Sequence, residues 1–208
     1  VVRKAKVLTD EKNLLSSLLD VTNRVVDEGA IGRLDRVVLS TTISTNAIVQ
    51  NKVDRVGLMI VSGPGLHPSS YELHPDSHFL AGYVNHRGIE MAAFDPQEAA
   101  RIGSRFQTEG IRHVGIVGKF STRNPVQETG IQEIVRSQVH HTSLGHRMSG
   151  HLNFPRRIAT TYLNEAVWDL YRHFVEEVLH FVRERGIQAP IYILKADGGT
   201  FDILQSVE

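Results

Sequence analysis

Four residues near the end of the chain, Asp197-Gly198-Gly199-Thr200, combine residue types that suit phosphate and metal chemistry. Paired glycines let consecutive backbone amides turn inward, the threonine hydroxyl adds a donor, and an aspartate can hold a hydrated Mg²⁺. Asp-Gly is also a common turn between antiparallel strands. From these residues alone, a phosphate-binding hairpin and a plain turn both remain open.

A second polar cluster lies far earlier in the sequence, between residues 40 and 49. It contains five hydroxyl residues and an asparagine: Ser40, Thr41, Thr42, Ser44, Thr45 and Asn46. The cluster stands where an expected strand passes into a short helix, so it supplies a helix cap and several further donors. Such donors suit an anion or a polar ligand, but simple capping of the helix explains the same residues.

The eleven histidines invite a metal hypothesis. His74 and His78 have the four-residue spacing of helical ligands, but Pro75 interrupts the helix that they would need. The chain has no cysteine, so it contains no compact zinc pattern. We therefore expect exposed or capping roles for most of the histidines.

The elements that must position these residues begin with a long amphipathic helix. It is predicted to start at Pro155, where a proline suits the first turn, and to end before Gly186. Its apolar residues fall in adjacent pairs every four positions, so the apolar stripe spirals around the helix and its two ends face different neighbours. Leu170 and Phe174 are predicted to be buried.

Strands and helices alternate along the chain. The expected strands cover residues 36–39, 55–61, 79–84, 113–118, 141–147 and 191–194, and the expected helices cover residues 10–26, 95–106, 126–138 and 155–185. This order predicts an α/β fold with a mixed, largely parallel sheet and flanking helices. Because ligands bind beyond the carboxyl ends of such strands, the loops that start at Ser40, Ser62, Lys119 and Asp197 are candidates to converge.

Composition narrows the classes of function. The chain has 208 residues, and its 23 basic side chains balance its 23 acidic ones, so no overall charge indicates binding to nucleic acid or to an anionic membrane surface. No apolar run approaches membrane length. The absence of cysteine excludes a disulfide scaffold and fits a reducing cytoplasm, where we expect the protein to act.

Three elements in order resemble the A-type proteins of the hydantoinase/oxoprolinase family. The stretch 39–49 is similar to that family's Thr-Thr-x-Ala-Thr-Asn-Ala element, and 120–128 is similar to its Phe-Ser-x-Arg-Asn-Pro-x-His-Glu element. The third, 194–200, also looks like the second phosphate hairpin of the actin-like (ribonuclease H-like) ATPase superfamily. The resemblance favours the phosphate hairpin over the plain turn.

The resemblance implies a subunit that uses ATP and Mg²⁺ to phosphorylate the carbonyl of a cyclic amide, such as a hydantoin or 5-oxoproline, for ring-opening hydrolysis. It also implies a B-type partner subunit or domain. An ATP-dependent ketone carboxylase subunit, of the acetone or acetophenone type, is the alternative within the family. A non-catalytic actin-like ATPase module that uses nucleotide only to change shape is the alternative from another class.

The same resemblance suggests roles for individual residues. Asp197 is assigned to the metal and to catalysis, and the neighbouring Gly198, Gly199 and Thr200 to the phosphates of the nucleotide. Thr41 and Thr42 are expected to act in catalysis by orienting the substrate. The expected substrate-binding residues are Asn46, Arg123 and Asn124.

The chain departs from the family pattern at several points. Ser44 replaces the usual alanine, and Gln127 stands where a histidine is common, so no acid-base role is carried over to position 127. The family's first phosphate loop does not precede Val1. We therefore expect an internal fragment, with the N-terminal α/β region in residues 1–154 and the truncated start of the ATPase domain in 155–208.

Overall fold

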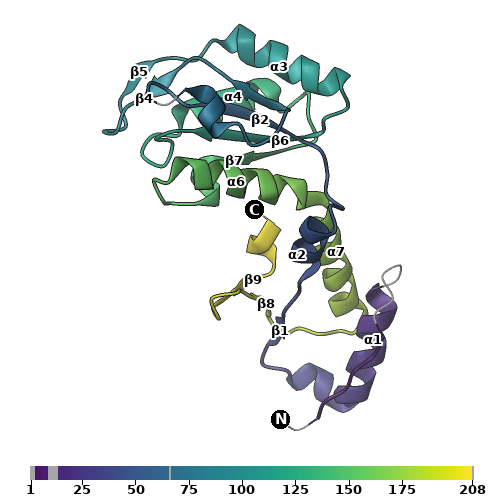
Figure 1. Cartoon of the computed structure of the whole chain (residues 1–208). Helices are drawn as coiled ribbons and strands as arrows, with labels where there is room; N and C mark the ends of the chain where they lie inside the picture. Colours follow the sequence, from purple (N-terminus) through teal and green to yellow (C-terminus); the bar gives the residue numbers. More distant parts are fainter. Residues whose placement is uncertain (1–2, 9–13, 66, 208) are drawn as a thin grey trace. The chain divides into compact units, whose positions relative to one another are not determined.

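In a computed structural model, which describes residues 3–8, 14–65 and 67–207, the chain forms two compact units (Figure 1). Unit 1 combines the two ends of the sequence, Val1–Ala47 and Trp168–Glu208, and unit 2 is Ile48–Val167. The division expected after residue 154 does not coincide with these units. It falls in the first turn of a helix of unit 2, and the expected second region contributes to both units.

Unit 1 is built around a three-stranded sheet with the order β1-β8-β9. Its elements are α1 (Leu14–Val25), the 3-10 helix η1 (Glu28–Arg33), β1 (Val37–Leu39), the start of α2 (Ile43–Val49), α7 (Trp168–Glu184), β8 (Ile191–Leu194), β9 (Thr200–Asp202) and η3 (Leu204–Val207). The helix expected from residue 10 is present from Leu14, and residues 9–13 lie outside the described residues.

The core of unit 1 lies between α7 and this sheet. Phe174 and Val178 of α7 pack with Ile191 and Ile193 of β8 and with Ile203. Strand β1 runs parallel to β8, with Leu39 opposite Ile193, and β9 returns antiparallel beside β8. Because β1 comes from the first part of the chain and β8 from the last, this sheet joins the two ends of the sequence.

Unit 2 contains a four-stranded sheet of order β3-β2-β6-β7 in which all three described pairings are parallel. Its elements are β2 (Val56–Val61), η2 (Pro68–Tyr71), β3 (Ser77–Phe79), β4 (Tyr83–Val84), β5 (Glu90–Ala92), α3 (Pro96–Thr108), β6 (His113–Gly118), α4 (Val126–Val135), β7 (His141–Leu144), α5 (Gly145–Met148) and α6 (Phe154–Ala166). The central strands β2 and β6 are buried along their whole length, as their continuous apolar runs require.

Helices cover both faces of the unit 2 sheet. Figure 1 shows α3 and α4 on one side of the strands and α6 on the other. Phe106 and Ile131 pack on the first face, and Ile158 packs on the second. Gly57 of β2 is required by close packing, since a Cβ atom there would lie 2.5 Å from the Phe106 ring.

The predicted single helix from Pro155 to Gly186 is wrong, because the structure has two helices. Helix α6 ends at Ala166 and α7 starts at Trp168. The carbonyl of Ala166 accepts a hydrogen bond of 2.9 Å from the amide of Asp54, which takes the place of the next helical bond. The predicted ends are confirmed: Pro155 lies in the first turn of α6, and Gly186, at φ +62°, follows α7.

The apolar stripe behaves as its spiral predicts, since Ile158 packs in the core of unit 2 and Phe174 in that of unit 1. Phe174 is only 8% exposed, whereas Leu170 is half-buried, so the burial prediction holds fully for Phe174 alone.

The mixed α/β architecture with a largely parallel sheet and flanking helices is confirmed. Two strand boundaries were wrong. The segment 79–84 splits between β3 and β4, and β7 ends at Leu144, where the short helix α5 starts. In the part of the chain that the structure describes, no helix is both long and apolar enough to cross a bilayer.

Candidate functional site

The two polar clusters of unit 1 leave the same edge of one sheet. Because β1 and β8 are parallel neighbours, the loop from Ser40 and the loop from Lys195 both follow carboxyl strand ends that lie side by side. Figure 1 shows these strands together, although they are about 150 residues apart in sequence. The prediction that the two loops share one edge is confirmed, and this edge is where α/β sheets bind ligands.

The Asp-Gly-Gly-Thr stretch forms the turn of a hairpin between β8 and β9. The amide of Lys195 donates to the carbonyl of Gly199 at 2.8 Å, and the amide of Gly198 donates to the carbonyl of Lys195 at 3.0 Å. Gly198 has φ +84°, a left-handed conformation that favours glycine, and open space surrounds it. The hairpin therefore needs a glycine at position 198, and a ligand can approach the backbone there.

Asp197 is held within the same turn. Its carboxylate accepts a hydrogen bond of 2.9 Å from the amide of Gly199 and lies 3.2 Å from Nζ of Lys195. The Gly199 amide, and next the Lys195 ammonium, lower the pKa of Asp197. The carboxylate is thus a good oxygen ligand for a hard cation, and it is exposed.

Only some of the hydrogen-bond donors in the hairpin are available to bind a phosphate group. The Gly198 and Gly199 amides, expected to face a phosphate, donate within the turn. The Lys195 ammonium, which also pairs with Asp197, and the hydroxyl of the exposed Thr200 are the other donors of the hairpin. A nucleotide phosphate would therefore be held by these side chains, or by amides released from the turn.

In the hydroxyl cluster, one threonine caps α2, and other side chains are exposed to solvent. Oγ1 of Thr41 accepts a hydrogen bond of 3.1 Å from the amide of Ile43 at the start of α2, so Thr41 is a helix cap. Oγ1 of Thr42 accepts from Nδ2 of Asn46 at 3.2 Å, and both side chains are exposed. A ligand can therefore reach Thr42 and Asn46 without disturbing the helix, and Ser40 and Thr45 of the same cluster are exposed as well.

Arg123 and Asn124 belong to unit 2, whereas the other predicted site residues belong to unit 1. Asn124 has a structural role, since its Nδ2 donates to the carbonyl of Gly88 and its Oδ1 accepts from the amide of Val126. These bonds fix the turn before α4 against the loop that joins β4 and β5. Arg123 is exposed in the same turn.

Three fully buried charged side chains were not predicted from the sequence: Glu128, Arg157 and Glu165. The available signal was the position of Glu128, which closes the Phe-Ser-x-Arg-Asn-Pro element. Its neighbour Gln127 donates to the carbonyl of Ala92 at 2.7 Å and to Glu90 at 3.0 Å, so position 127 holds the β4–β5 hairpin. Glu128 faces the carboxyl ends of β6 and β7 instead.

Glu165 lies at the opposite, amino-terminal ends of β6 and β7. Its carboxylate accepts hydrogen bonds from Ser143 at 2.5 Å and bonds Nδ1 of His113 at 3.1 Å and Nδ1 of His141 at 2.9 Å. Burial alone would raise the pKa of Glu165, but these hydrogen bonds outweigh it and hold the pKa below its ordinary value. The cluster ties α6 to two strands through one buried charge.

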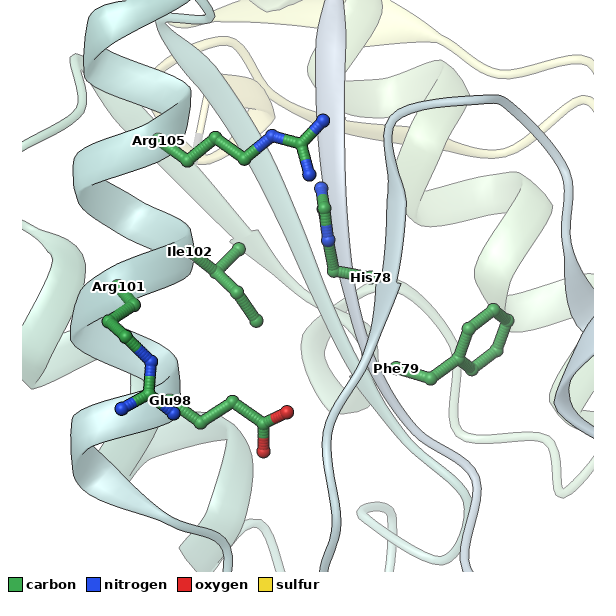
Figure 2. A pocket seen from close by; sticks show the side chains of 6 residues that line it. All are labelled: His78, Phe79, Glu98, Arg101, Ile102 and Arg105. Carbon is green, nitrogen blue, oxygen red and sulfur yellow. The ribbon is translucent and has the colours of Figure 1, made fainter.

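A surface hollow of about 250 Å³ lies between α3 and the edge strand β3, with His78 turned toward Arg105 of the helix (Figure 2). Burial, and next the charge of Arg105, lower the pKa of His78. Arg105 pairs with Glu109 at 2.7 Å, and Arg101 lies 3.8 Å from Asp95. Because its cations already have partners, the hollow is a weaker candidate than the sheet edges.

His74 and His78, considered above as metal ligands, have other contacts. Nδ1 of His74 accepts from the amide of Asp76 at 3.3 Å, and the ring of His78 packs against Phe106 with centroids 5.2 Å apart. Both contacts are those of structural histidines.

Comparison with known proteins relates the chain to large ATP-dependent enzymes. The alpha subunit of a caprolactamase from Pseudomonas jessenii is 24% identical over an alignment 216 positions long, which covers 90% of this chain and 30% of that protein. A nucleotide-free structure of acetone carboxylase, from work on ATP-dependent acetone carboxylation, aligns with a TM-score of 0.82 and 16% identity over 95% of this chain and 33% of that one.

The solved structure of the ATP-dependent caprolactamase from Pseudomonas jessenii aligns with a TM-score of 0.71 and 21% identity, over 91% of this chain and 30% of that one. At such identities the likeness to solved structures is one of fold. The chain spans about a third of the length of these relatives.

A family model described as the hydantoinase/oxoprolinase N-terminal region matches residues 1–139. Because that match covers most of the chain, the chain belongs to the hydantoinase/oxoprolinase family.

Proposed function

We propose that this chain is part of a subunit that uses ATP to activate the carbonyl of a cyclic amide by phosphorylation, so that the ring opens by hydrolysis. The observation that carries the proposal is the parallel pairing of β1 with β8, which brings the threonine cluster and the glycine hairpin to one sheet edge. Membership of the hydantoinase/oxoprolinase family supports it, as does the 24% identity to a caprolactamase subunit.

At this edge, Lys195 and Thr200 would hold nucleotide phosphates, with Gly198 leaving room for them, and Asp197 would hold the metal. ATP with Mg²⁺ supplies the phosphoryl group that turns a poor leaving oxygen into a good one. Thr42 and Asn46 would orient the amide by hydrogen bonds. Such positioning accounts for much of the rate enhancement in phosphoryl transfer, because the protein forms few covalent bonds itself.

The assignment of residues 155–208 to the start of an actin-like ATPase domain belongs to the same proposal. So does a B-type partner subunit, which the name of the related caprolactamase alpha subunit supports. Roles for Arg123 and Asn124 in substrate binding have the least support in this proposal, because the side chain of Asn124 already forms hydrogen bonds that hold the turn before α4.

A second candidate is an ATP-dependent ketone carboxylase subunit. The likeness of fold to acetone carboxylase, with a TM-score of 0.82, is compatible with it. The two candidates share nucleotide chemistry and differ in the acceptor.

The test is ATP hydrolysis by the full-length protein with its partner subunit. We expect cyclic amides of the hydantoin, oxoproline or lactam type to stimulate hydrolysis and to be opened in equal amount. Stimulation by acetone with bicarbonate instead would establish the carboxylase. ATP hydrolysis that responds to neither acceptor but changes binding of a protein partner would establish a non-catalytic switch.

Matched variants tie this activity to the sheet edge. Thr200→Val should raise the KM for ATP, because it removes a hydroxyl donor from the hairpin, and Asn46→Ala should raise the KM for the acceptor. Thr108→Val, at the exposed end of α3, is the control because, among the described residues, its hydroxyl bonds only the carbonyl of Ser104. Unchanged kinetics in both site variants would move the active site away from this edge.

A further inference from the structure

The segment between α4 and the end of α6 is basic, although the chain as a whole has no net charge. From Ile134 to Asn164, 31 residues include no aspartate or glutamate. The segment carries four arginines and four histidines: Arg136, His140, His141, His146, Arg147, His151, Arg156 and Arg157. Its middle part follows the carboxyl end of β7, which is a ligand-binding position in parallel sheets.

Glu128 is the carboxylate that the described contacts place against this part of the segment, and both of its oxygens are in use. Oε1 accepts from the amide of Gly118 at 2.7 Å. Oε2 accepts from the amide of His146 at 2.9 Å and lies 2.5 Å from Nδ1 of the same histidine. Because Glu128 is completely buried and both of its oxygens are bonded within the protein, it orders this edge and is not itself a contact for a ligand.

This arrangement leaves His146 with one ring nitrogen available. Nδ1 is bound to Glu128, whereas Nε2 has no partner in the described part of the chain. The side chain is 19% exposed, and Nε2 is not among the buried polar atoms that lack a partner, so it reaches the surface. A buried carboxylate on one nitrogen fixes the orientation of an imidazole and leaves the other nitrogen for a ligand.

Arg157 holds together the segments beside His146 through hydrogen bonds to backbone carbonyls. The guanidinium is fully buried and donates to the carbonyls of Gly118, Lys119 and His151. It thereby joins the loop after β6 to the segment after α5, and its guanidinium adds positive charge at this edge beside the negative charge of Glu128.

Further basic side chains follow His146 and the end of β6. Arg147 is exposed on α5, and His151 is exposed in the segment that follows this helix. Lys119, which follows the neighbouring strand β6, uses one of its donors on the carbonyl of Pro64.

We propose that this edge of unit 2 binds a small oxyanion, such as a phosphate or a carboxylate. The main contact is Nε2 of His146, with Arg147 beside it. In the bound state the anion would accept a hydrogen bond from Nε2 of His146, while Nδ1 keeps its contact with the buried carboxylate of Glu128. The site goes beyond the proposed function, because the nucleotide hairpin belongs to unit 1.

Chemical modification of the full-length protein tests the site without relying on enzyme activity. Diethyl pyrocarbonate acylates accessible imidazole nitrogens, and peptide mass spectrometry locates the product. We expect His146 to react in chloride buffer and to be protected severalfold by inorganic phosphate or by acetate at the same ionic strength, which keeps general screening constant. His173, exposed on α7, should react equally in all three buffers.

Protection by phosphate alone would identify a phosphate site, and protection by acetate as well would identify a site for carboxylates. Absence of reaction at His146 in chloride, or reaction that neither anion slows, would overturn the proposal. Both readouts are independent of ATP turnover, so failure of the proposed function would leave them unchanged.

Variants complete the test. His146→Asn keeps an amide donor for Glu128 but removes the nitrogen at the surface, so calorimetry should show at least about tenfold weaker binding of the protecting anion. Arg147→Gln, at an exposed position, should weaken binding without affecting folding, and His173→Asn is the matched control. Wild-type affinity in both His146→Asn and Arg147→Gln would contradict the proposal.

Discussion

The edges at which parallel strands end are built in opposite ways in the two units. In unit 1, Asp197, Thr42 and Asn46 are exposed, and their hydrogen bonds stay within a few residues of sequence. In unit 2, Glu128 and Arg157 are buried and connect segments far apart in sequence. The unit 2 edge is therefore rigid before any ligand binds, whereas the unit 1 edge offers donors that a ligand must organise.

The largest expected effect is the loss of a buried charge in unit 2. Replacing Glu165 with Ala leaves His113, His141 and Ser143 without their common acceptor, so the free energy of unfolding should fall by about 3–5 kcal/mol. Chemical denaturation measures it. Glu133→Ala is the control, because Glu133 is exposed and its ion pair within the described part of the chain is with Arg136. A loss below about 1 kcal/mol would show that unit 2 does not depend on its buried charges.

Helix α7 provides a comparison within unit 1. Phe174→Ala should destabilise the protein by about 3–5 kcal/mol, because it removes a buried aromatic ring from the core beside β8. Leu170→Ala should have a smaller effect, about 1–2 kcal/mol, because Leu170 is already half in contact with water. Equal losses in thermal or chemical denaturation would show that Leu170 is buried in solution.

Acid should weaken unit 2 through Glu165. Hydrogen bonds from the two histidines and Ser143 outweigh burial and depress the pKa of Glu165 below its ordinary value of 4.5. A depressed carboxyl pKa contributes stability that is present above the unfolded pKa and is lost as the pH falls through the folded pKa. The free energy of unfolding should therefore decline below about pH 4.5 more steeply in wild type than in Glu165→Gln. Parallel declines would contradict this assignment.

The smallest expected effects distinguish a helix-capping residue, Thr41, from a ligand-binding one, Thr42, at the unit 1 edge. Thr41→Val removes the cap of α2 and should lower the free energy of unfolding by about 1 kcal/mol. Thr42→Val should change stability by less than about 0.5 kcal/mol, since the partner of its hydroxyl among the described residues is the exposed Asn46. If Thr42 orients the acceptor, its variant should instead lower acceptor-stimulated ATP hydrolysis, measured beside Thr41→Val.

Sequence periodicity predicted which helices and strands are present better than it predicted where they begin and end. The buried runs at 56–61 and 113–118 became central strands, and the strand end before Ser40 and that before Lys195 met at one edge, as parallel strands require. The break at Val167 was not predictable, because it depends on a backbone bond from Asp54, more than a hundred residues earlier. Glu128, Arg157 and Glu165 were missed for a similar reason: their partners come from distant segments, and charge patterns in a single sequence indicate solvent exposure by default.

The unequal lengths of the strands in unit 2 have a consequence for its behaviour at high concentration. The six-residue strands β2 and β6 lie in the middle of the sheet, and the flanking strands are β3, with three residues, and β7, with four. A short outer strand exposes few unpaired amides and carbonyls, which are the groups that recruit another chain into a growing sheet. The most aggregation-prone sequences of the unit, its continuous apolar runs, are thus shielded on both sides and emerge only when the sheet itself opens.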